Sequence, residues 1–275
     1  MRPPAVMGVV NVTPDSFSDG GRYFDQGAAV AHGLALVGEG AAVIDVGGES
    51  TRPFADPVDP EEEQRRVLPV IRELAPHVRV SIDTRHASTA EAAIEAGATL
   101  VNDVSASLAK VAAAHDVGWV AMHMLGDPRT MQVAPSYDDV VAEVRQFLVS
   151  RADEAVAAGV EEVWIDPGFG FGKTLGHNLA LLAHIDTLVA TGYPVLVGLS
   201  RKQFLGRLLA ASDRRTTEPP LPGLRAPLAE ADPVAADDRL EGSIATAVWA
   251  MAHGVQMVRA HDVAPTVHAA ALVAA

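Results

Sequence analysis

The sequence contains no cysteine among its 275 residues, and it is short of positive charge. Without cysteine the chain forms no disulfides, binds no metal through thiolates and uses no cysteine nucleophile. Lysine and arginine number 21 against 35 aspartates and glutamates, which gives a net charge of −14. That balance argues against nucleic acid and anionic membrane surfaces as partners, because both would repel the chain. An anionic ligand must therefore meet a local group of basic side chains.

The start of the chain has no long apolar run. The apolar stretch that follows Met1–Pro4 is too short for a signal peptide or a membrane span. We therefore expect a cytoplasmic protein with no membrane partner. Apolar residues make up 49% of the chain, which is enough for the core of one large α/β domain or two small ones.

Eight short β-type runs recur along the chain, and most are continuously apolar rather than alternating. This is the pattern of parallel strands that are covered on both faces. The runs are 6–10, 42–46, 78–82, 99–101, 119–122, 163–165, 195–198 and 257–258.

Segments rich in alanine, leucine and glutamate separate these runs and have helical spacing. They include 27–37, 60–74, 87–96, 138–158, 178–190 and 240–252. Eight strands that alternate with helices over about 250 residues predict a single-domain, eight-stranded parallel β/α (TIM) barrel. A doubly wound open sheet is the alternative, but Asn11–Pro14 stands after the first strand where that fold carries a glycine triplet for dinucleotides.

Almost every predicted strand ends in a polar residue. A single such residue is often a cap or a buried, hydrogen-bonded group, but a ring of eight is poorly explained in that way. In a barrel all of them would lie at the carboxyl-terminal rim, where the active sites of this fold are found. These residues are Asn11, Asp45, Asp83, Asn102, Asp103, His123, Asp166, Ser200–Lys202, Arg259 and His261.

The stretch Val163–Thr174 combines a strand, a carboxylate and a glycine-rich turn. The glycines allow the backbone to approach a ligand closely, and Phe169 and Phe171 offer flat apolar faces beside it. A tight strand-to-helix turn without a ligand is the alternative. The stretch also approximates a phosphate-binding loop, but only three residues separate Gly168 from Gly172 where that motif needs four.

The polar rim suits a nitrogen heterocycle with an anionic tail. Asp83, Asn102 and Asp166 can match the donor and acceptor edge of such a ring, and Lys202 can bond a ring carbonyl or ring nitrogen. The cations available for an anion are Arg52, Lys173, Arg259 and His261. No Ser-His-Asp order and no histidine-rich metal spacing supports a hydrolase or a zinc site.

Three segments interrupt the alternation of strands and helices. Residues 11–25 and 47–59 are long first and second loops that suit mobile lids or are simply flexible. Ser212–Asp238 is rich in proline and mixed charge, which predicts a disordered or loosely packed insertion in the single domain 1–275, not a second domain.

Eight segments, in order and over almost the whole chain, closely resemble the dihydropteroate synthase family. They are Asn11–Gly21, Asp45–Pro53, Ser81–Thr84, Asn102–Ser105, Met122–Met124, Asp166–Lys173, Ser200–Lys202 and Arg259–Asp262. The resemblance implies a β/α barrel that joins 4-aminobenzoate to 7,8-dihydropterin-6-ylmethyl diphosphate and releases pyrophosphate. It also implies Mg²⁺ as a cofactor, competition by sulfonamides and a possible homodimer.

The resemblance also implies residue roles. Asp83, Asn102, Asp166 and Lys202 correspond to the pterin-binding set, with Met122 beside the ring. Asn11 corresponds to the Mg²⁺/pyrophosphate residue. The residues that bind the diphosphate in the family correspond to Arg52, Arg259 and His261. The aminobenzoate pocket corresponds to Phe17, Thr51, Pro53, Phe171 and Ser200, and Phe169 is then not the ring contact. Asp83, Asp166, Lys202, Arg259 and His261 carry the catalytic assignment.

Three departures from the family pattern stand out. Ala106 replaces a usual glycine, Ala260 replaces a usual valine, and Ser212–Asp238 is longer than usual. Two rival interpretations are a methyltransferase-type pterin-binding domain, which lacks the pyrophosphate grip, and a non-catalytic paralogue. The intact Ser200–Lys202 motif argues against both.

Overall fold

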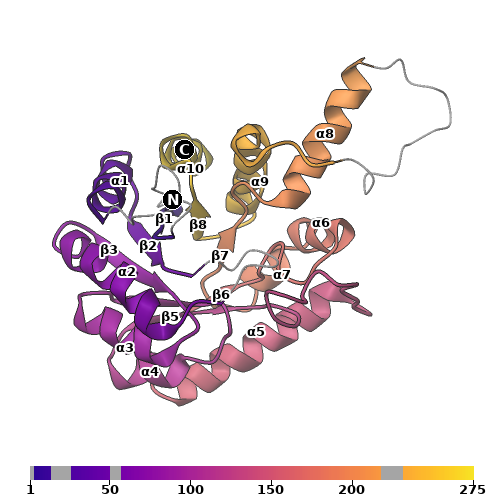
Figure 1. Ribbon diagram of the computed structural model, residues 1–275. Coiled ribbons are helices and arrows are strands. Elements are labelled where there is room, and N and C mark those ends of the chain that lie inside the picture. Colours follow the sequence, from indigo (N-terminus) through magenta and orange to yellow (C-terminus); the bar gives the residue numbers. More distant parts are fainter. Residues whose placement is uncertain (1–2, 14–25, 50–56, 218–231) are drawn as a thin grey trace.

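The computed structural model describes residues 3–13, 26–49, 57–217 and 232–275. Its strands form one parallel sheet in the order β6-β5-β4-β3-β2-β1-β8-β7. A bridge between Ile165 and Val195 joins the two end strands, so the sheet curves round into a barrel (Figure 1). The predicted barrel is therefore confirmed, and the doubly wound alternative is wrong. The strands are β1 Ala5–Asn11, β2 Val43–Gly47, β3 Arg79–Asp83, β4 Leu100–Asp103, β5 Gly118–Met122, β6 Val163–Asp166, β7 Leu196–Gly198 and β8 Met257–Ala260.

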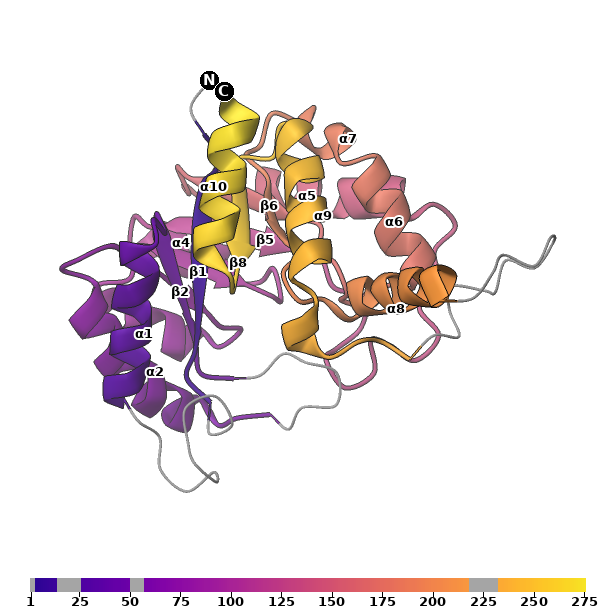
Figure 2. The same ribbon diagram turned by 90° about the horizontal axis from the view of Figure 1, so that it is seen from above.

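Helices surround the barrel and cover the outer face of the strands (Figures 1 and 2). The helix predicted over 178–190 is in fact two helices, and two others, α4 and α10, were not among the predicted segments. The helices are α1 Gln26–Gly38, α2 Pro60–Leu74, α3 Ala87–Glu95, α4 Ala109–Ala114, α5 Val140–Ala157, α6 Leu175–Ala183, α7 Asp186–Val189, α8 Gln203–Thr217, α9 Leu240–Ala252 and α10 Val263–Ala274.

Helix α2 shows why the sequence can predict the first and last residues of some helices. Asp59 caps its start, since its side chain accepts a hydrogen bond of 2.9 Å from the Glu61 N–H. Pro60 occupies the first turn, where no N–H is needed, and three glutamates there favour the helix dipole. The apolar stripe that includes Val67 and Ile71 is buried against the sheet. The predicted bounds of 60–74 are confirmed.

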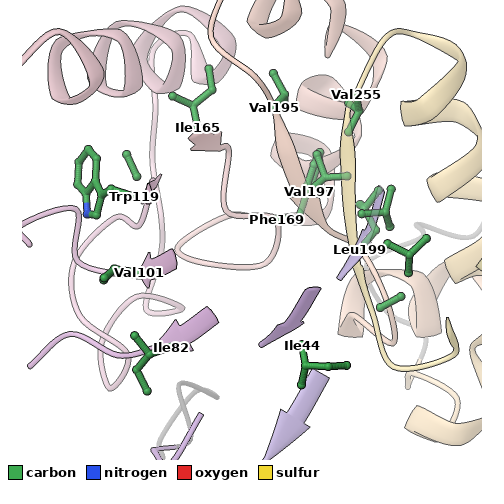
Figure 3. Close-up of a cluster of buried hydrophobic side chains, with 14 of the residues drawn as sticks. Ile44, Ile82, Val101, Trp119, Ile165, Phe169, Val195, Val197, Leu199 and Val255 are labelled. Atoms are coloured by element: carbon green, nitrogen blue, oxygen red, sulfur yellow. The ribbon is translucent and has the colours of Figure 1, made fainter. Parts of the chain in front are cut away.

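Two apolar clusters determine which end of the barrel stays polar. The larger cluster lies between the strands and the helices, where Figure 3 shows residues such as Ile44, Ile82 and Trp119. The smaller one fills the barrel interior and is made by Met7, Val43, Leu100, Val120, Leu196 and Met257. Its members lie in the early parts of their strands and leave the carboxyl-terminal half of the interior to polar side chains.

The segment predicted as a loose insertion, Ser212–Asp238, is regular at both ends. Helix α8 continues to Thr217 and projects away from the barrel wall (Figure 1). On the return, the Val234 N–H donates to the Gly206 carbonyl at 3.2 Å, and Ala236–Asp238 form a 3₁₀ turn. The prediction is wrong for these ends, while 218–231 lie outside the described residues. In the described part of the chain, no helix is long and apolar enough to cross a membrane.

Candidate active site

The alternation of side chains along each strand places the predicted polar residues inside the barrel mouth. Successive residues of a strand face opposite sides, so the residue two positions beyond an interior apolar residue also faces inward. Four interior residues are followed in this way by polar or flexible ones: Val43 by Asp45, Leu100 by Asn102, Val120 by Met122 and Met257 by Arg259.

The strand register then brings residues from different strands side by side. Asp83 pairs with Asn102 across β3 and β4, and Met122 pairs with Asp166 across β5 and β6. Gly198 pairs with Arg259 across β7 and β8. Asp83, Asn102 and Asp166 are therefore at one rim, and Lys202, the fourth residue predicted to hold a heterocycle, lies four residues beyond the end of β7.

Arg259 is held between two carboxylates in the interior. Its Nε donates to Asp45 Oδ2 at 2.6 Å, and its Nη2 donates to Asp83 Oδ2 at 2.8 Å. Asn102 Nδ2 donates to the same Asp45 oxygen at 2.9 Å. Asp45 is fully buried and organises both partners, a role that was not predicted from the sequence. Its position at the end of a strand was the available signal.

Two buried carboxylate oxygens in this mouth lack hydrogen-bond partners among the described residues, Asp45 Oδ1 and Asp83 Oδ1. An unpaired buried acceptor is costly, so the site is complementary to a ligand that brings N–H donors. Burial raises the pKa of Asp83 to about 7, although the charge of Arg259 opposes the shift. The mouth can therefore present this group as an acid or as a carboxylate near neutral pH.

Asp166 ends β6 and is fixed by the turn that follows it. Its Oδ1 accepts a hydrogen bond of 2.7 Å from the Gly168 N–H, and burial raises its pKa to about 6. Gly168 has φ +65°, and a Cβ there would lie 2.0 Å from the His123 carbonyl oxygen. Glycine is required at this position because the backbone must pass that close to the end of β5.

Lys173 supports the same turn from behind. Its Nζ lies 2.9 Å from His123 Nδ1 and donates to the carbonyls of Gly168 and Phe171 at 3.0 Å each. The side chain is buried, and burial lowers its pKa to about 7. Lys173 is a structural residue of the turn, contrary to the prediction that it supplies a cation for an anionic ligand.

The two phenylalanines of the turn have different surroundings. Phe169 is buried in the core beside Phe204, with the ring centroids 6.3 Å apart, and Figure 3 shows it among the core residues. Phe171 is half-buried, and Lys202 Nζ lies 4.1 Å from its ring centroid. Burial lowers the pKa of Lys202 to about 8. Phe171 is thus the phenylalanine beside the polar mouth.

Ser200 and His261 meet where the ends of β7 and β8 come together. The His261 N–H donates to Ser200 Oγ at 3.1 Å, and His261 Nδ1 also lies 3.1 Å from that oxygen. Burial, with the nearby charge of Arg259, lowers the pKa of His261 to about 3. The imidazole is therefore neutral at pH 7 in this structure, whereas the sequence predicted a cation at this position.

Asp103 is a strand-end residue that does not reach the mouth. It faces the opposite way from Asn102, and its carboxylate accepts from the backbone N–H groups of Ser107 and Leu108 and from Trp119 Nε1. It organises the loop that contains Ala106, whose φ of +50° lies in the region that favours glycine. The sequence departure at Ala106 therefore coincides with a left-handed backbone position.

Asn11 ends β1 on the interior face, four residues after Met7, and its side chain is partly exposed. Among the described residues, no group of three or more histidine, cysteine, aspartate or glutamate side chains could hold a metal ion. The remaining predicted residues lie outside the described residues; they are Phe17, Thr51, Arg52 and Pro53.

This arrangement has clear counterparts among known proteins. Residues 7–261 match the family described as pterin binding enzyme. The chain is 47% identical to the dihydropteroate synthase of Mycobacterium leprae, and the alignment covers 100% of this chain and 94% of that protein. The chain belongs to the dihydropteroate synthase family.

Solved dihydropteroate synthase structures agree with this assignment. The Xanthomonas albilineans dihydropteroate synthase with 4-aminobenzoic acid superposes with a TM-score of 0.84 at 45% identity, covering 98% of this chain and 92% of that one. The Yersinia pestis enzyme in a sulfonamide complex gives 0.85 at 40% identity, covering 99% and 94%. As a dihydropteroate synthase, the chain is a transferase of folate biosynthesis, and the methyltransferase-type and non-catalytic interpretations are not favoured.

Proposed function

We propose that this chain joins 7,8-dihydropterin-6-ylmethyl diphosphate to 4-aminobenzoate, giving 7,8-dihydropteroate and pyrophosphate. The observation that carries the proposal is the barrel mouth itself. Asp83, Asn102, Asp166 and Lys202 come together there from four different strands or strand ends, beside buried carboxylate oxygens that need N–H donors.

The pterin ring supplies the groups that this mouth lacks. Its ring N–H and amino groups are donors for Asp166 and Asp83, while Asn102 can both donate and accept. Lys202 can donate to a ring carbonyl or ring nitrogen. Met122 is buried at the same rim, and its flexible thioether suits the face of a flat ring.

The diphosphate leaves from the side where β7 and β8 end. In the proposed reaction the bond between the methylene carbon and the diphosphate oxygen breaks first, and its electron pair departs with the diphosphate. The cation that remains is stabilised by the electron-rich ring and by the carboxylates of Asp83 and Asp166. The 4-amino nitrogen of aminobenzoate then attacks the methylene carbon and loses a proton.

Arg259, His261 and Arg52 are assigned to the leaving diphosphate. Neutral His261 serves as a hydrogen-bonding group, since its pKa is lowered to about 3. Phe171 and Ser200 are assigned to the aminobenzoate side of the mouth with Phe17, Thr51 and Pro53. Sulfonamides, which share the shape of aminobenzoate, are proposed to compete there.

Mg²⁺ is the proposed cofactor, and Asn11 is the residue proposed to hold it. The side-chain oxygen of an asparagine is a hard ligand of the kind that Mg²⁺ prefers, and Mg²⁺ at substrate phosphates needs only one or two protein ligands. The partly exposed Asn11 at the mouth fits that requirement. When bound, the ion would neutralise charge on the diphosphate.

Two further proposals concern the chain as a whole. A homodimer is proposed, and its support is Trp249 of α9, which stacks on His253 yet remains 46% exposed. Light scattering after size exclusion, with Trp249→Glu for comparison, would test it. A cytoplasmic location is proposed because a diphosphate ester is too highly charged to cross a bilayer unaided.

The decisive experiment for the function measures pyrophosphate release with the pterin diphosphate, aminobenzoate and Mg²⁺ present, and with each left out in turn. The proposal expects release that is coupled one-to-one to dihydropteroate formation and that depends on aminobenzoate. A folded protein that binds pterin without producing pyrophosphate would support the methyltransferase-type or non-catalytic interpretation instead.

A further inference from the structure

Arg201 lies between two assigned residues, Ser200 and Lys202, yet it has no assigned role of its own. Its φ of +59° lies in the left-handed region, which residues other than glycine seldom adopt. Its backbone N–H donates to Ser243 Oγ at 3.0 Å, and its carbonyl accepts from Arg239 Nη1 at 2.9 Å. Both contacts come from the α9 region and hold the unusual backbone conformation in place.

The guanidinium of Arg201 reaches a different element. Its Nη2 donates to Asp262 Oδ1 at 2.6 Å and its Nε donates to Asp262 Oδ2 at 3.1 Å, which makes a bidentate pair. Asp262 directly follows His261, as Arg201 directly follows Ser200. Since His261 also contacts Ser200 at 3.1 Å, two neighbouring residues of one loop bind two neighbouring residues of the other.

This pair differs from an ordinary surface ion pair. Arg201 and Asp262 are 36% and 23% exposed at the side chain, and a single hydrogen bond between such groups would contribute little. Two parallel hydrogen bonds between a planar guanidinium and a carboxylate fix direction as well as distance. Lysine cannot reproduce that geometry, because its ammonium is a single point charge.

We propose that Arg201 and Asp262 are positioning residues that fix Ser200 relative to His261, on the side of the mouth that handles diphosphate and aminobenzoate. This inference rests on the proposed function of that site. Loss of the bidentate pair should let the loops after β7 and β8 move apart. Asp83, Asn102 and Asp166, at the ends of β3, β4 and β6, are held by separate hydrogen bonds and should be little affected.

The test uses Arg201→Lys and Asp262→Asn, which break the same pair from opposite sides, so it does not depend on one variant folding. Arg79→Lys is the matched control. Arg79 makes a bidentate pair with Glu162 of 2.9 and 2.6 Å at the opposite end of the barrel, with side chains 33% and 38% exposed. Calorimetry measures the affinity of each variant for pyrophosphate with Mg²⁺ and for 6-hydroxymethylpterin, and steady-state assays measure kcat and each KM.

The expected result is a loss of about tenfold or more in pyrophosphate affinity and in kcat for either variant, since charge-assisted hydrogen bonds of this kind are involved. Pterin affinity should fall by less than pyrophosphate affinity, because Lys202 is the one residue of the pterin set on this loop, and Arg79→Lys should change neither. The double variant should be no worse than Asp262→Asn alone, because both changes break one contact.

Wild-type kinetics in Arg201→Lys, equal losses of pterin and pyrophosphate affinity, or additive effects in the double variant would each overturn the inference. These outcomes are separate from failure of the proposed function. If the proposed function itself were wrong, the wild-type protein would release no pyrophosphate from the two substrates.

Discussion

At the scale of single residues, buried carboxylates decide what the mouth can bind. Asp83 and Asp166 lie where burial disfavours their charge, and the pKa values of both groups are raised, to about 7 and about 6. The charge of Arg259 opposes the rise in the pKa of Asp83, but the effect of burial is larger. A ligand with N–H donors would favour the ionised forms, so pterin binding and carboxylate ionisation should be coupled.

Asp166→Asn is expected to abolish detectable pterin binding. The amide presents a donor where the ring also donates, and an unpaired buried group of this kind costs about 1–3 kcal/mol or more. Calorimetry with 6-hydroxymethylpterin measures the effect. Asp153→Asn, on the exposed face of α5, is the control and should bind as the wild type does. Near-native affinity in Asp166→Asn would remove this residue from the pterin set.

The same variant should change how stability depends on pH. Because the folded-state pKa of Asp166 is raised to about 6, its contribution is fully present below the unfolded value near 4 and is lost as the pH rises through 6. Between pH 4.5 and 7.5 the loss is about 2 kcal/mol. Urea unfolding at both pH values measures this loss of unfolding free energy. The loss should be smaller in Asp166→Asn than in the wild type by about this amount. Identical pH dependence in the two proteins would contradict the raised pKa.

At the scale of elements, the turn between β6 and α6 is the most tightly specified part of the site. Gly168 passes close to the His123 carbonyl, and Lys173 binds the turn carbonyls from the buried side. At the other end of the turn, Thr174 and His177 form a capping box that starts α6. These contacts hold Asp166 at the rim without help from a ligand.

Gly168→Ala should destabilise the protein by several kcal/mol, because its new Cβ would collide with a backbone oxygen. Gly192→Ala is a matched control. Gly192 also has a positive φ, of +88°, but a Cβ there would meet nothing within 4 Å. Gly192→Ala should therefore lower the free energy of unfolding by only about 1–2 kcal/mol, because alanine disfavours this backbone conformation. Urea unfolding measures both, and similar losses in the two variants would show that the close approach to β5 is relaxed in solution.

At the scale of the whole molecule, the insertion should tolerate shortening only in its middle. Val234 is hydrogen-bonded to the Gly206 carbonyl, eleven residues before the end of α8, so a bridge from Thr217 must span about 17 Å along the helix. Replacing 218–231 by about eight Gly/Ser residues meets that distance. We expect kcat within a few-fold, since loop length changes the closure entropy slowly.

Deleting all of 212–238 should lower kcat further. It removes Val234, whose carbonyl accepts from Arg239, and Arg239 also donates to the Arg201 carbonyl. Steady-state assays of both deletions test this contrast. A collapse of activity in the shorter deletion, with the fold intact, would mean that 218–231 serve the site or an interface.

Substrate binding should be ordered, with the pterin diphosphate first and aminobenzoate second. The proposed chemistry forms the ring cation before attack, and diphosphate is expected to complete the aminobenzoate pocket through Arg52, Thr51 and their neighbours. Aminobenzoate should bind about tenfold or more tightly with pyrophosphate, Mg²⁺ and a pterin present, as in typical coupled sites. Equilibrium titration measures both affinities. Equal values would refute ordered assembly but leave the enzyme assignment intact.

The sequence by itself determined the barrel and the residues at its rim. Apolar runs, helical spacing and caps such as Asp59 act over a few residues, so they are readable without the fold. Strand ends marked by Asp83, Asn102 and Asp166 followed from the same local pattern, and alternation along each strand placed them inward. Helices α4 and α10 were missed because alanine-rich segments carry a weak amphipathic signal.

Only the tertiary structure decided how the charged residues are paired. Arg259 lies 214 residues from Asp45 and 176 from Asp83 in sequence, and they meet because β8 closes the barrel against β1. Burial of Lys173 and neutrality of His261 likewise depend on neighbours from other strands. Hydrophobic periodicity is set locally, but the charge state and partners of a side chain depend on the atoms that exclude water from it. Those atoms are fixed only when distant strands come into register.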